Sequence, residues 1–577
     1  MKDLKHKANN AALAVALAVA TIAGELEAKE GAPRNNSFFI CDAPVNVLFA
    51  NKADGDGKNA VVLPPKPSPA PDPKALLSTY VRRFNANDDE TVTNAIPNAA
   101  AERFLAANVP LFACPDREIE RNWYFRWWTY RKHLRKGASG GWRVTEFLPK
   151  VGWSGTDNTI VCAAGHHFRE GRWLRDPQHL ADNARFWLAD KDASHRWGYS
   201  SWLFTGTCQL AEVSGLDDLP VALLDDAVKY YEQWERGVPK NRGKFIMGGD
   251  GNGGFMSTDG NEGTEISLGG SGWKPLFNSA MWSEAKSIAA VARRAGRAEL
   301  AAKFEAKAEA TRKALMEKCW NADVKFFTTR HRDGVLTSVR ELHGYAPWYF
   351  GMPLDVLPDW EQLFDPKGFS ALYGLTFPER RAKGFKIAYK GHECQWNGPS
   401  WPFATSVALT AYANDLHVRG STSAERERFS FLVRQYASAH KLHRAPGKAT
   451  GGPSDPVVPW IDENMNPDKP DWIARTLLIQ RSQKPRERGK DYNHSTFCDL
   501  VVSGLVGFVP NGADGFTVDP LCPEKWDWFV LDNLRYRGHG VSIRWHRGHG
   551  GLVVKVDGRD AARSDTLSRV RVKLSSD

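Results

Sequence analysis

Residues 395–416 have the sequence QWNGPSWPFATSVALTAYANDL, in which a loop rich in tryptophan and proline runs directly into an apolar segment. From Trp401 to Leu416 the apolar residues recur at the spacing of one helix face. The loop itself offers aromatic and amide side chains held by two prolines. The stretch therefore predicts a helix that begins directly after a rigid aromatic loop.

The same helical periodicity extends outward from this stretch, from about Glu118 to Gly507. The clearest further segments are 278–295, 299–320, 423–442 and 497–507, and shorter ones begin near residues 176, 200 and 217. Loops rich in glycine, asparagine and proline separate about a dozen such segments, and no fixed-period repeat indicates a solenoid. We expect a mainly α fold in which paired helices form a closed double ring, an (α/α)₆ toroid.

The two ends of the chain have other patterns. Three lysines precede an apolar run at residues 11–20, which is typical of a secretory signal and too short to span a membrane. A proline-rich connector follows at 63–73, and apolar runs between turns predict a small all-β region after residue 510. We expect a secreted or periplasmic protein divided into a signal peptide (1–23), an N-terminal extended or β segment (24–115), the helical domain (116–508) and a C-terminal β domain (509–577).

Composition narrows the function classes. The 22 tryptophans favour a carbohydrate cleft, because the indole face packs on sugar C–H groups while its N–H donates a hydrogen bond. The net charge of +10 is spread along the chain, which argues against a nucleic-acid arm. The eight scattered cysteines include no CxxC pair, so neither a zinc site nor a dense disulfide scaffold is expected. No cofactor motif is present, a structural Ca²⁺ is allowed but not indicated, and the oligomeric state stays open.

Four loop segments combine acids with tryptophan, glycine and asparagine. The first is 253–270, with Glu262 and Glu265, and the second is 341–353, with Glu341 and His343. The third is 395–402. The fourth is 460–467, which contains Glu463 and continues in a later stretch at 491–497. Each carboxylate could be a surface or capping group or a prepared acid, and His343 could be structural or a proton carrier. The paired tryptophans of 395–402 suit a platform for a sugar ring.

Together these segments resemble known glycosidases. The segment 395–402 resembles the QWDxPxxWPP signature of family 37 trehalases and the W-x-G-P-x-W segment of family 63 glycosidases, the group that includes mannosylglycerate-hydrolase-like enzymes. Residues 263–267 (GTEIS) stand where those families have G-W-D-[FY]-S with the general acid, and 461–467 (IDENMNP) resembles their Y-E-x-Y-D-P segment with the base. Residues 492–497 resemble the H-F-x-G-W segment that follows. The resemblance runs in matching order from about 118 to 507.

The resemblance implies a glycoside hydrolase that cleaves a terminal bond of an oligo- or polysaccharide through an oxocarbenium-like state. Glu265 is the expected general acid, with a pKa raised by burial against aromatics such as Trp273, and Glu463 is the expected general base. The related families invert configuration, which implies carboxyl groups about 6.5–9.5 Å apart. Glu262 and Glu341 are reserve carboxylates. Glu265 has one methylene more than the family's aspartate.

Substrate contacts are expected from side chains of the same loops and of the inner helices. They are Trp396, Asn397, Trp401, Trp348, His343, His494, Trp128 and Arg169. Asn397 replaces the trehalase aspartate, which argues against trehalose as the substrate. Five further residues could contact sugar or only fill the core: Arg126, Trp127, His166, His167 and Trp173.

Two other functions stay open at this point. One is a carbohydrate-binding protein without catalysis, and the other is a polysaccharide lyase on the same toroid, with His343 and Tyr345 as its pair. A serine hydrolase and a P-loop enzyme are not supported, because neither GxSxG after a strand nor a Walker motif is present. The sugar, the linkage, the anomer and the choice between endo and exo action are not set by the sequence.

Overall fold

The computed structural model of this protein describes residues 70–193, 195–239, 246–443 and 457–574. The predicted signal peptide and most of the proline-rich connector lie outside the described residues. In the part of the chain that is described, no helix combines the length and the apolar character that crossing a bilayer requires.

Helices dominate residues 70–505. They are α2 (Pro73–Ala86), α3 (Ala101–Asn108), α4 (Arg117–Lys132), α5 (Ala164–Gly171), α6 (Gln178–Ala189), α7 (Leu203–Ser214), α8 (Asp218–Ala222), α9 (Leu224–Arg236), α10 (Pro275–Arg294), α11 (Ala298–Cys319), α12 (Ala346–Tyr349), α13 (Pro402–Arg419), α14 (Ser423–Ala439), α15 (Ile473–Gln480) and α16 (Phe497–Asp499), which continues into the π-helical turn η5 (Leu500–Leu505). The segments predicted at 278–295, 299–320, 401–416 and 423–442 match α10, α11, α13 and α14 within a few residues.

Local sequence explains several helix ends. Asp116 accepts hydrogen bonds from the amides of residues 118 and 119 at the start of α4, and Thr422 forms a capping box with Glu425 at the start of α14. Pro402 occupies the first turn of α13, where its missing N–H leaves no hydrogen bond unmade. Gly215 ends α7 in the left-handed conformation that glycine adopts without strain.

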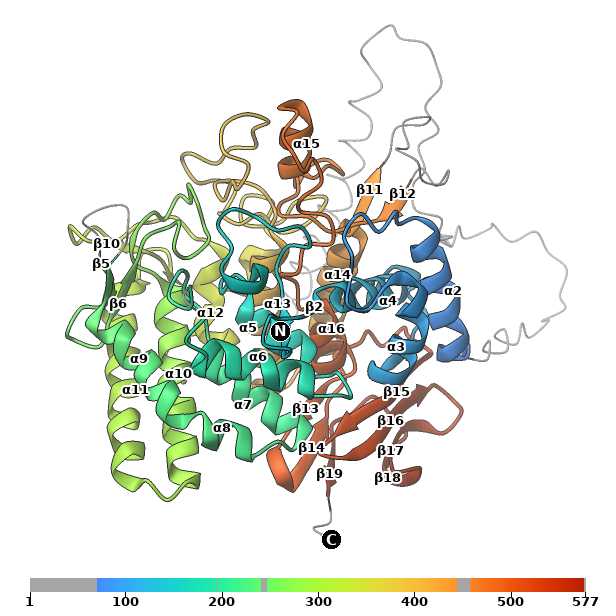
Figure 1. The fold of residues 1–577 in the computed structure, drawn as a ribbon. Coiled ribbons are helices and arrows are strands. Elements are labelled where there is room, and N and C mark those ends of the chain that lie inside the picture. Colours follow the sequence, from blue (N-terminus) through green and yellow to red (C-terminus); the bar gives the residue numbers. More distant parts are fainter. Residues whose placement is uncertain (1–69, 194, 240–245, 444–456, 575–577) are drawn as a thin grey trace, which may run out of the picture. The chain divides into compact units, whose positions relative to one another are not determined.

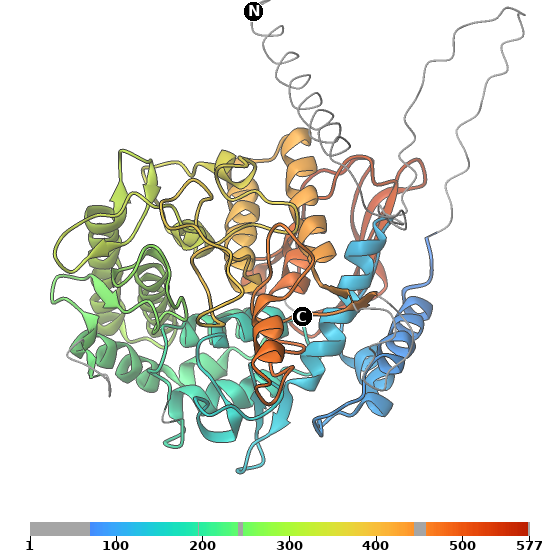
Figure 2. The same ribbon diagram turned by 90° about the horizontal axis from the view of Figure 1, so that it is seen from above.

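The helices of the described unit pack around a closed ring. In succession α4 packs on α16, α16 on α5, α5 on α7, α7 on α10, α10 on α12 and α12 on α13, and α14 beside α13 packs back on α4 (Figures 1 and 2). Helix α4 is buried around most of its circumference, whereas α11 buries seven of its 22 residues, which lie along one face. These helices therefore form an inner and an outer layer, which confirms the predicted mainly α toroid.

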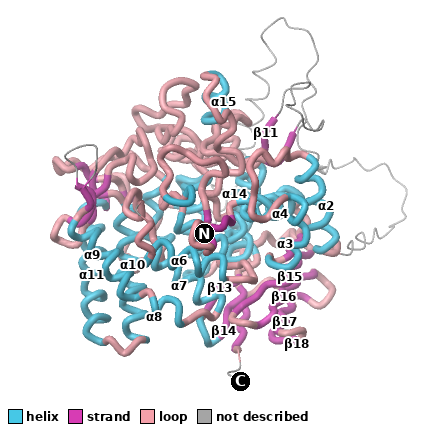
Figure 3. The backbone as a smooth tube through the Cα atoms, viewed as in Figure 1, coloured by secondary structure: helices cyan, strands magenta, loops and turns pink. Residues whose placement is uncertain are grey.

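Long loops and the C-terminal strands gather at different ends of the helices. In the view of Figure 3 the loops crowd the upper end, and the C-terminal strands lie at the lower end. Some of these loops contain short strands: β2 (Leu134–Lys136), β3 (Trp142–Val144), β4 (Val238–Pro239), β5 (Ile246–Gly249), β6 (Phe255–Ser257), β7 (Gly272–Trp273), β8 (Trp320–Asn321), β9 (Phe326–Phe327), β10 (Arg330–His331), β11 (Lys441–His443) and β12 (Val457–Pro459). The loop end is where the chemistry-bearing segments of the sequence meet.

The C-terminal region is all β, as predicted. Its strands are β13 (Phe508–Pro510), β14 (Gly515–Val518), β15 (Trp528–Tyr536), β16 (His539–His546), β17 (Gly551–Val556), β18 (Arg559–Ser564) and β19 (Val570–Lys573). Together with β1 (Leu111–Ala113) they form an antiparallel sheet with the order β1-β15-β16-β17-β18 and a three-stranded sheet with the order β13-β14-β19. Strand β14 ends at Val518, where the chain turns away into residues with no strand partner.

The N-terminal expectation needs a correction. Within 24–115, the described residues 70–115 contain the helices α2 and α3 rather than an extended or β segment, because Leu77, Val81 and Phe84 form an apolar helix face that packs on α4. The one strand there, β1 (Leu111–Ala113), pairs with β15 at the edge of the C-terminal sheet. Residues before the toroid therefore complete a sheet formed by residues after it.

Candidate active site

One cavity at the loop end collects side chains from segments far apart in the sequence. It encloses about 750 Å³, its open mouth included. Its wall is formed by Glu146, Phe147, Trp153, Ile160, Cys162, Tyr199, Gly263, Glu265, His392, Glu393, Cys394, Trp396, Trp401, Phe403, Glu463, Arg488, Tyr492 and His494. Three of the four loop segments singled out in the sequence therefore reach this cavity. They are 253–270, 395–402, and 460–467 with its later stretch 491–497.

The two carboxyl groups expected to act as acid and base both line this cavity. Glu265 is partly exposed there, and Glu463 is 1% exposed. Burial raises the pKa of Glu265 from 4.5 to about 7, the nearby Glu463 adds to the rise, and His392 opposes it. A carboxyl with this pKa keeps a proton near neutral pH, which a general acid requires. Trp273, expected to contribute to that burial, lies away from the cavity in β7 and donates to Asp250.

The loop that carries Glu265 has an unusual backbone. Gly263 has φ +69°, and a Cβ added there would lie 2.7 Å from Cys162 Sγ, so only glycine fits. Ile266 also has a positive φ of 57°, which costs a β-branched residue about 1–3 kcal/mol. The Trp396 amide donates to the Glu265 carbonyl (3.2 Å) and ties this loop to the aromatic segment. Strain next to a candidate catalytic side chain is typical of functional loops.

Glu463 is surrounded by hydrogen-bond donors. Arg488 Nε donates to Oε1 (3.2 Å), and the Cys394 thiol donates to Oε2 (2.9 Å). The Glu463 amide donates to Asp462 Oδ1 (2.8 Å), which fixes the backbone on the other side. Burial and then the neighbouring Glu463 raise the pKa of Asp462 to about 7. The arrangement holds one carboxylate in a single orientation, with the Arg488 guanidinium as its counter-charge.

Aromatic side chains form another part of the wall. The rings of Trp396 and Trp401 are parallel with centroids 3.9 Å apart, and His494 lies 6.1 Å from Trp401. Trp401 Nε1 donates to the Gln395 carbonyl (2.8 Å), which fixes the orientation of the pair. At 44% exposure Trp153 is open to solvent, and the Arg488 guanidinium lies 4.9 Å above its ring. Such a wall presents apolar faces to C–H groups and leaves polar edges for hydroxyls.

The two reserve carboxylates lie outside the cavity wall. Glu262 is buried, accepts from the Phe277 amide at the start of α10 and pairs with Lys274 (3.2 Å). Glu341 is buried and accepts from the Gly269 amide (2.8 Å). Both carboxylates are occupied by the packing of the loop around residue 270, so neither replaces Glu265 or Glu463 at the cavity.

Five of the expected substrate contacts are also absent from the cavity wall. Asn397 is half-buried beyond the tryptophan pair, where its carbonyl accepts from Lys386. His343 is buried behind that pair with its ring 5.8 Å from Trp396, and Trp348 packs on Phe327. The other two are held on the inner helices: Trp128 donates to Asn85 (2.8 Å), and Arg169 pairs with Asp499 (2.7 Å). Their own packing and pairing partners therefore account for these positions.

The weaker candidates belong to the core between the inner helices. Buried and absent from the cavity wall are Arg126, Trp127, His166, His167 and Trp173. His166 stacks on Phe403 with centroids 4.1 Å apart, and Trp173 donates to Asp499 (2.8 Å). His343 and Tyr345, the residues considered as the catalytic pair of a lyase, are also buried and absent from the cavity wall. The Tyr345 hydroxyl donates to the Asp359 carbonyl (2.7 Å).

Several cavity residues were not predicted from the sequence. Glu146 is the most important, because it adds a second buried carboxyl to the wall besides Glu463 and accepts from the Tyr492 hydroxyl. Its sequence neighbourhood gives no signal, because Glu146 stands between Thr145 and Phe147 in a loop after the β2–β3 hairpin. Arg488 and Cys394 were missed because single arginines and cysteines have many other uses. Among the described residues no cluster of three or more His, Cys, Asp or Glu side chains could hold a metal ion.

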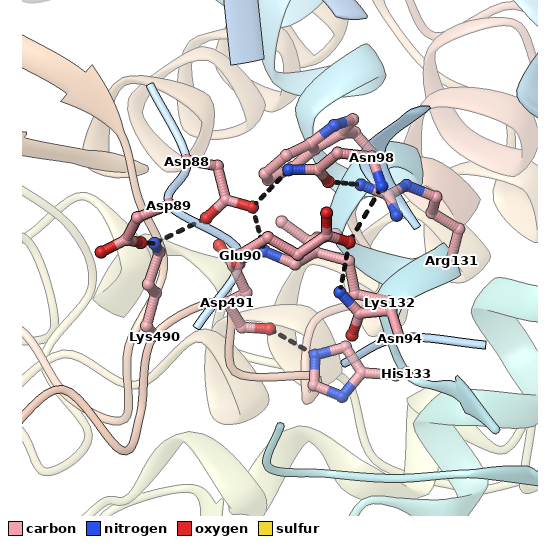
Figure 4. A network of polar contacts seen from close by, with 12 residues as sticks. Asp88, Asp89, Glu90, Asn94, Asn98, Arg131, Lys132, His133, Lys490 and Asp491 are labelled. Carbon is pink, nitrogen blue, oxygen red and sulfur yellow. Dashed lines mark hydrogen bonds and ion pairs between the residues drawn. The ribbon is translucent and has the colours of Figure 1, made fainter. Parts of the chain in front are cut away.

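A buried ion network holds the segment that supplies Arg488, Tyr492 and His494 (Figure 4). Lys490 pairs with Asp88 (2.6 Å), and Lys132 of α4 pairs with both Asp88 (2.9 Å) and Asp491 (2.6 Å). His133 Nε2 lies 2.7 Å from the Asp491 carbonyl oxygen. The loop after α2 is thereby connected to the inner helix and to this segment of the cavity wall.

Comparisons with known proteins identify glycoside hydrolase domains in this chain. Residues 156–495 match the model of the mannosylglycerate hydrolase MGH1-like glycoside hydrolase domain, and residues 512–562 match that of the glycosyl hydrolase family 65 C-terminal domain. A solved structure titled "Sialidase" is 32% identical with a TM-score of 0.76, and the match covers 87% of this chain and 45% of that one. The chain thus spans less than half the length of that protein.

Two rhamnosidase structures are more distant. The GH78 family rhamnosidase of Bacillus sp. GL1 is 13% identical with a TM-score of 0.47, and the match covers 78% of this chain and 41% of that one. The alpha-L-rhamnosidase from Dictyoglumus thermophilum is 10% identical with a TM-score of 0.46, covering 80% and 45%. The family model spans more than half of the chain and includes Glu265 and Glu463. This chain belongs to the family of mannosylglycerate hydrolase MGH1-like glycoside hydrolase domains.

Proposed function

We propose that this protein hydrolyses a glycosidic bond of an oligo- or polysaccharide, with Glu265 as general acid and Glu463 as general base. One observation supports this most directly: two carboxyl groups 198 positions apart in the sequence (265 and 463) line the same aromatic cavity in different environments. Glu265 has a raised pKa and forms no ion pair with any described residue, whereas Glu463 pairs with Arg488. This difference matches the division of labour that glycoside hydrolysis requires.

In the proposed reaction Glu265 protonates the leaving glycosidic oxygen while Glu463 removes a proton from an attacking water molecule. Positive charge develops on the ring oxygen and anomeric carbon, and the wall formed by Trp396 and Trp401 excludes bulk water. We propose inversion of configuration, since the resembled families invert. The first-formed anomer, followed by ¹H NMR before mutarotation, tests this point: a product with retained configuration contradicts it.

Separate Glu265→Gln and Glu463→Gln variants test the assignment. Each should lower kcat by about 10²–10⁴-fold while sugar binding persists. Glu262→Gln and Glu341→Gln are matched controls, because these carboxylates are buried outside the cavity; they should lower stability and leave kcat per folded molecule unchanged. Unchanged turnover in both cavity variants, or no turnover of any glycoside by the unmodified protein, would refute the proposal and favour a binding protein without catalysis.

Location and domain division are part of the same proposal. We propose that residues 1–23 direct export and are removed, that residues 116–508 form the catalytic toroid, and that residues 509–577 form its β domain. The lysines before an apolar run support export, and the match of residues 512–562 to a glycosidase C-terminal domain supports the last division. Mass spectrometry of the protein recovered from secreting cells measures the cleavage site, and an intact N-terminus would contradict export.

A further inference from the structure

The cavity wall contains three buried polar atoms without a hydrogen-bond partner in the described part of the chain. They are Glu146 Oε2, Trp396 Nε1 and His494 Nε2, and their residues are only 3%, 3% and 2% exposed. A buried polar atom left unpaired costs about 1–3 kcal/mol, so native proteins seldom tolerate several around one cavity. Neither of the proposed proton transfers uses these atoms. Their three residues share one wall, so a molecule bound in the cavity would lie next to them.

Glu146 is held firmly in this position. Its carbonyl accepts from the Asn493 amide (3.0 Å), and the next residue, Phe147, accepts from Asn158 Nδ2 (3.0 Å). Oε1 accepts from the Tyr492 hydroxyl, and Oε2 has no hydrogen-bond partner in the described part of the chain. The backbone and one oxygen are therefore anchored, and the other oxygen remains available to a ligand.

The protonation of Glu146 suits a sugar hydroxyl. Burial raises its pKa to about 8; Glu463 and Glu265 add to the rise, while the hydrogen bond from Tyr492 opposes it. The carboxyl is then neutral at pH 7 and can both donate and accept, as a hydroxyl partner requires. Trp396 adds an N–H donor, and burial lowers the pKa of His494 well below 6.5, so its ring is neutral and also offers Nε2.

The charges of the wall disfavour an anionic sugar. Four carboxyl groups line the cavity: burial raises the pKa of Glu146 and of Glu265, which favours their neutral forms, while Glu393 and Glu463 carry the negative charge. The one guanidinium on the wall, that of Arg488, already pairs with Glu463 (3.2 Å) and Glu393 (2.9 Å). A sugar carboxylate would lose its water here and find no unpaired arginine or lysine on the described wall.

We propose that Glu146, together with Trp396 and His494, forms a hydroxyl-binding wall that selects an uncharged sugar. This inference rests on the proposed function, because it names the class of sugar that the same cavity takes. Glu146 acts as a substrate-binding group and moves no proton during the reaction. The proposal separates it from the two other carboxyls that share the cavity.

Binding is measured in the wild-type protein, because the free monosaccharides used as probes have no glycosidic bond to hydrolyse and the pairing of Arg488 with Glu463 is kept. Calorimetry compares glucose with glucuronic acid and galactose with galacturonic acid, pairs that differ at C6 in charge, with mannose and rhamnose as further uncharged probes. We expect at least one uncharged sugar to bind, and each uronate to bind at least tenfold more weakly than its neutral partner. A uronate that binds as tightly as its partner would overturn the charge selection.

Substitutions at Glu146 test its role. Glu146→Ala should weaken binding of the tightest neutral sugar by about tenfold to hundredfold, because one hydrogen bond is lost and its partner is left buried. Glu146→Gln should stay within threefold, since an amide also donates and accepts. Glu284→Gln is the matched control: Glu284 is buried in α10 with a pKa raised to about 7 by burial, and it lies outside the cavity. It reports the effect of such a change on thermal stability and should leave sugar binding unchanged.

Two outcomes contradict the assignment of Glu146. Unchanged binding in Glu146→Ala would mean that it does not touch the sugar, and a loss of turnover in the single variant Glu146→Gln as large as that in Glu265→Gln would make it a proton-transfer group. Sugar binding by a wild-type protein that turns over no glycoside would refute hydrolysis and leave the hydroxyl-binding wall intact. Binding of none of the six sugars would contradict the hydroxyl-binding wall, while turnover of a glycoside decides the proposed hydrolysis separately.

Discussion

Activity should decline above pH 7 because Glu265 loses the proton that it gives to the leaving group. Burial raises its pKa from 4.5 to about 7. A group with the ordinary value would be about 0.3% protonated at pH 7, whereas this one is about half protonated, so its surroundings contribute a rate factor of roughly 150 at that pH. The active form is the protonated one, so each pH unit well above 7 should lower kcat/KM by about tenfold.

The assay is the pH dependence of kcat/KM on an oligosaccharide, whose leaving hydroxyl needs a proton, and on a dinitrophenyl glycoside of the same sugar, whose leaving group does not. With the oligosaccharide the alkaline limb should fall with an apparent pKa near 7, and Glu265→Gln should abolish that limb together with most of the rate. With the dinitrophenyl glycoside Glu265→Gln should retain far more of its rate. An alkaline limb that survives in Glu265→Gln would show that another group donates the proton.

Two other predictions concern residues that hold the site and the core. Cys394→Ala should lower kcat by about tenfold to hundredfold, because Glu463 loses a hydrogen bond of 2.9 Å. Cys394→Ser keeps a donor and should restore most of the rate across the pH profile. Equal rates in the two variants would refute a positioning role for Cys394. Asp499→Asn should reduce the free energy of unfolding in urea by about 3–5 kcal/mol, since Arg169 and Arg172 are left buried without their carboxylate. The KM for the substrate should not change. An unchanged urea midpoint would contradict this account.

The fold was predictable wherever helices bury a continuous face. The periodicity of α10, α11, α13 and α14 repeats every three to four residues over 17 to 22 positions, which no strand would produce. Helix α2 was missed because it follows directly on the proline-rich connector, and proline at its first position was taken as part of that connector rather than as a helix start. The pairing of β1 with β15 joins residues more than 400 positions apart, and local sequence carries no signal for such a contact.

Site residues were predictable from the sequence only where the amino-acid composition of the surrounding loop is unusual. Glu265 and Glu463 stand in loops whose glycines and tryptophans have no obvious use in a core, and both reach the cavity. Glu262 and Glu341 stand in equally rich loops, and their outcome depends on Lys274 and a backbone amide that only the folded chain brings near. Glu146 shows the opposite case, since nothing in its neighbourhood marks it and its importance comes from Tyr492, a residue 346 positions away.

Two carboxyls of one cavity with pKa values raised by burial, those of Glu265 and Glu146, raise the question of which one donates the proton. A general acid must recover its proton from solvent after every turnover, and Glu265 is partly exposed, whereas Glu146 is 3% exposed and fixed by Tyr492. A strained loop carries Glu265, while backbone hydrogen bonds on both sides lock Glu146. If this assignment holds, Glu146→Gln keeps the alkaline limb near pH 7 and Glu265→Gln loses it. The reverse pattern would exchange the two roles.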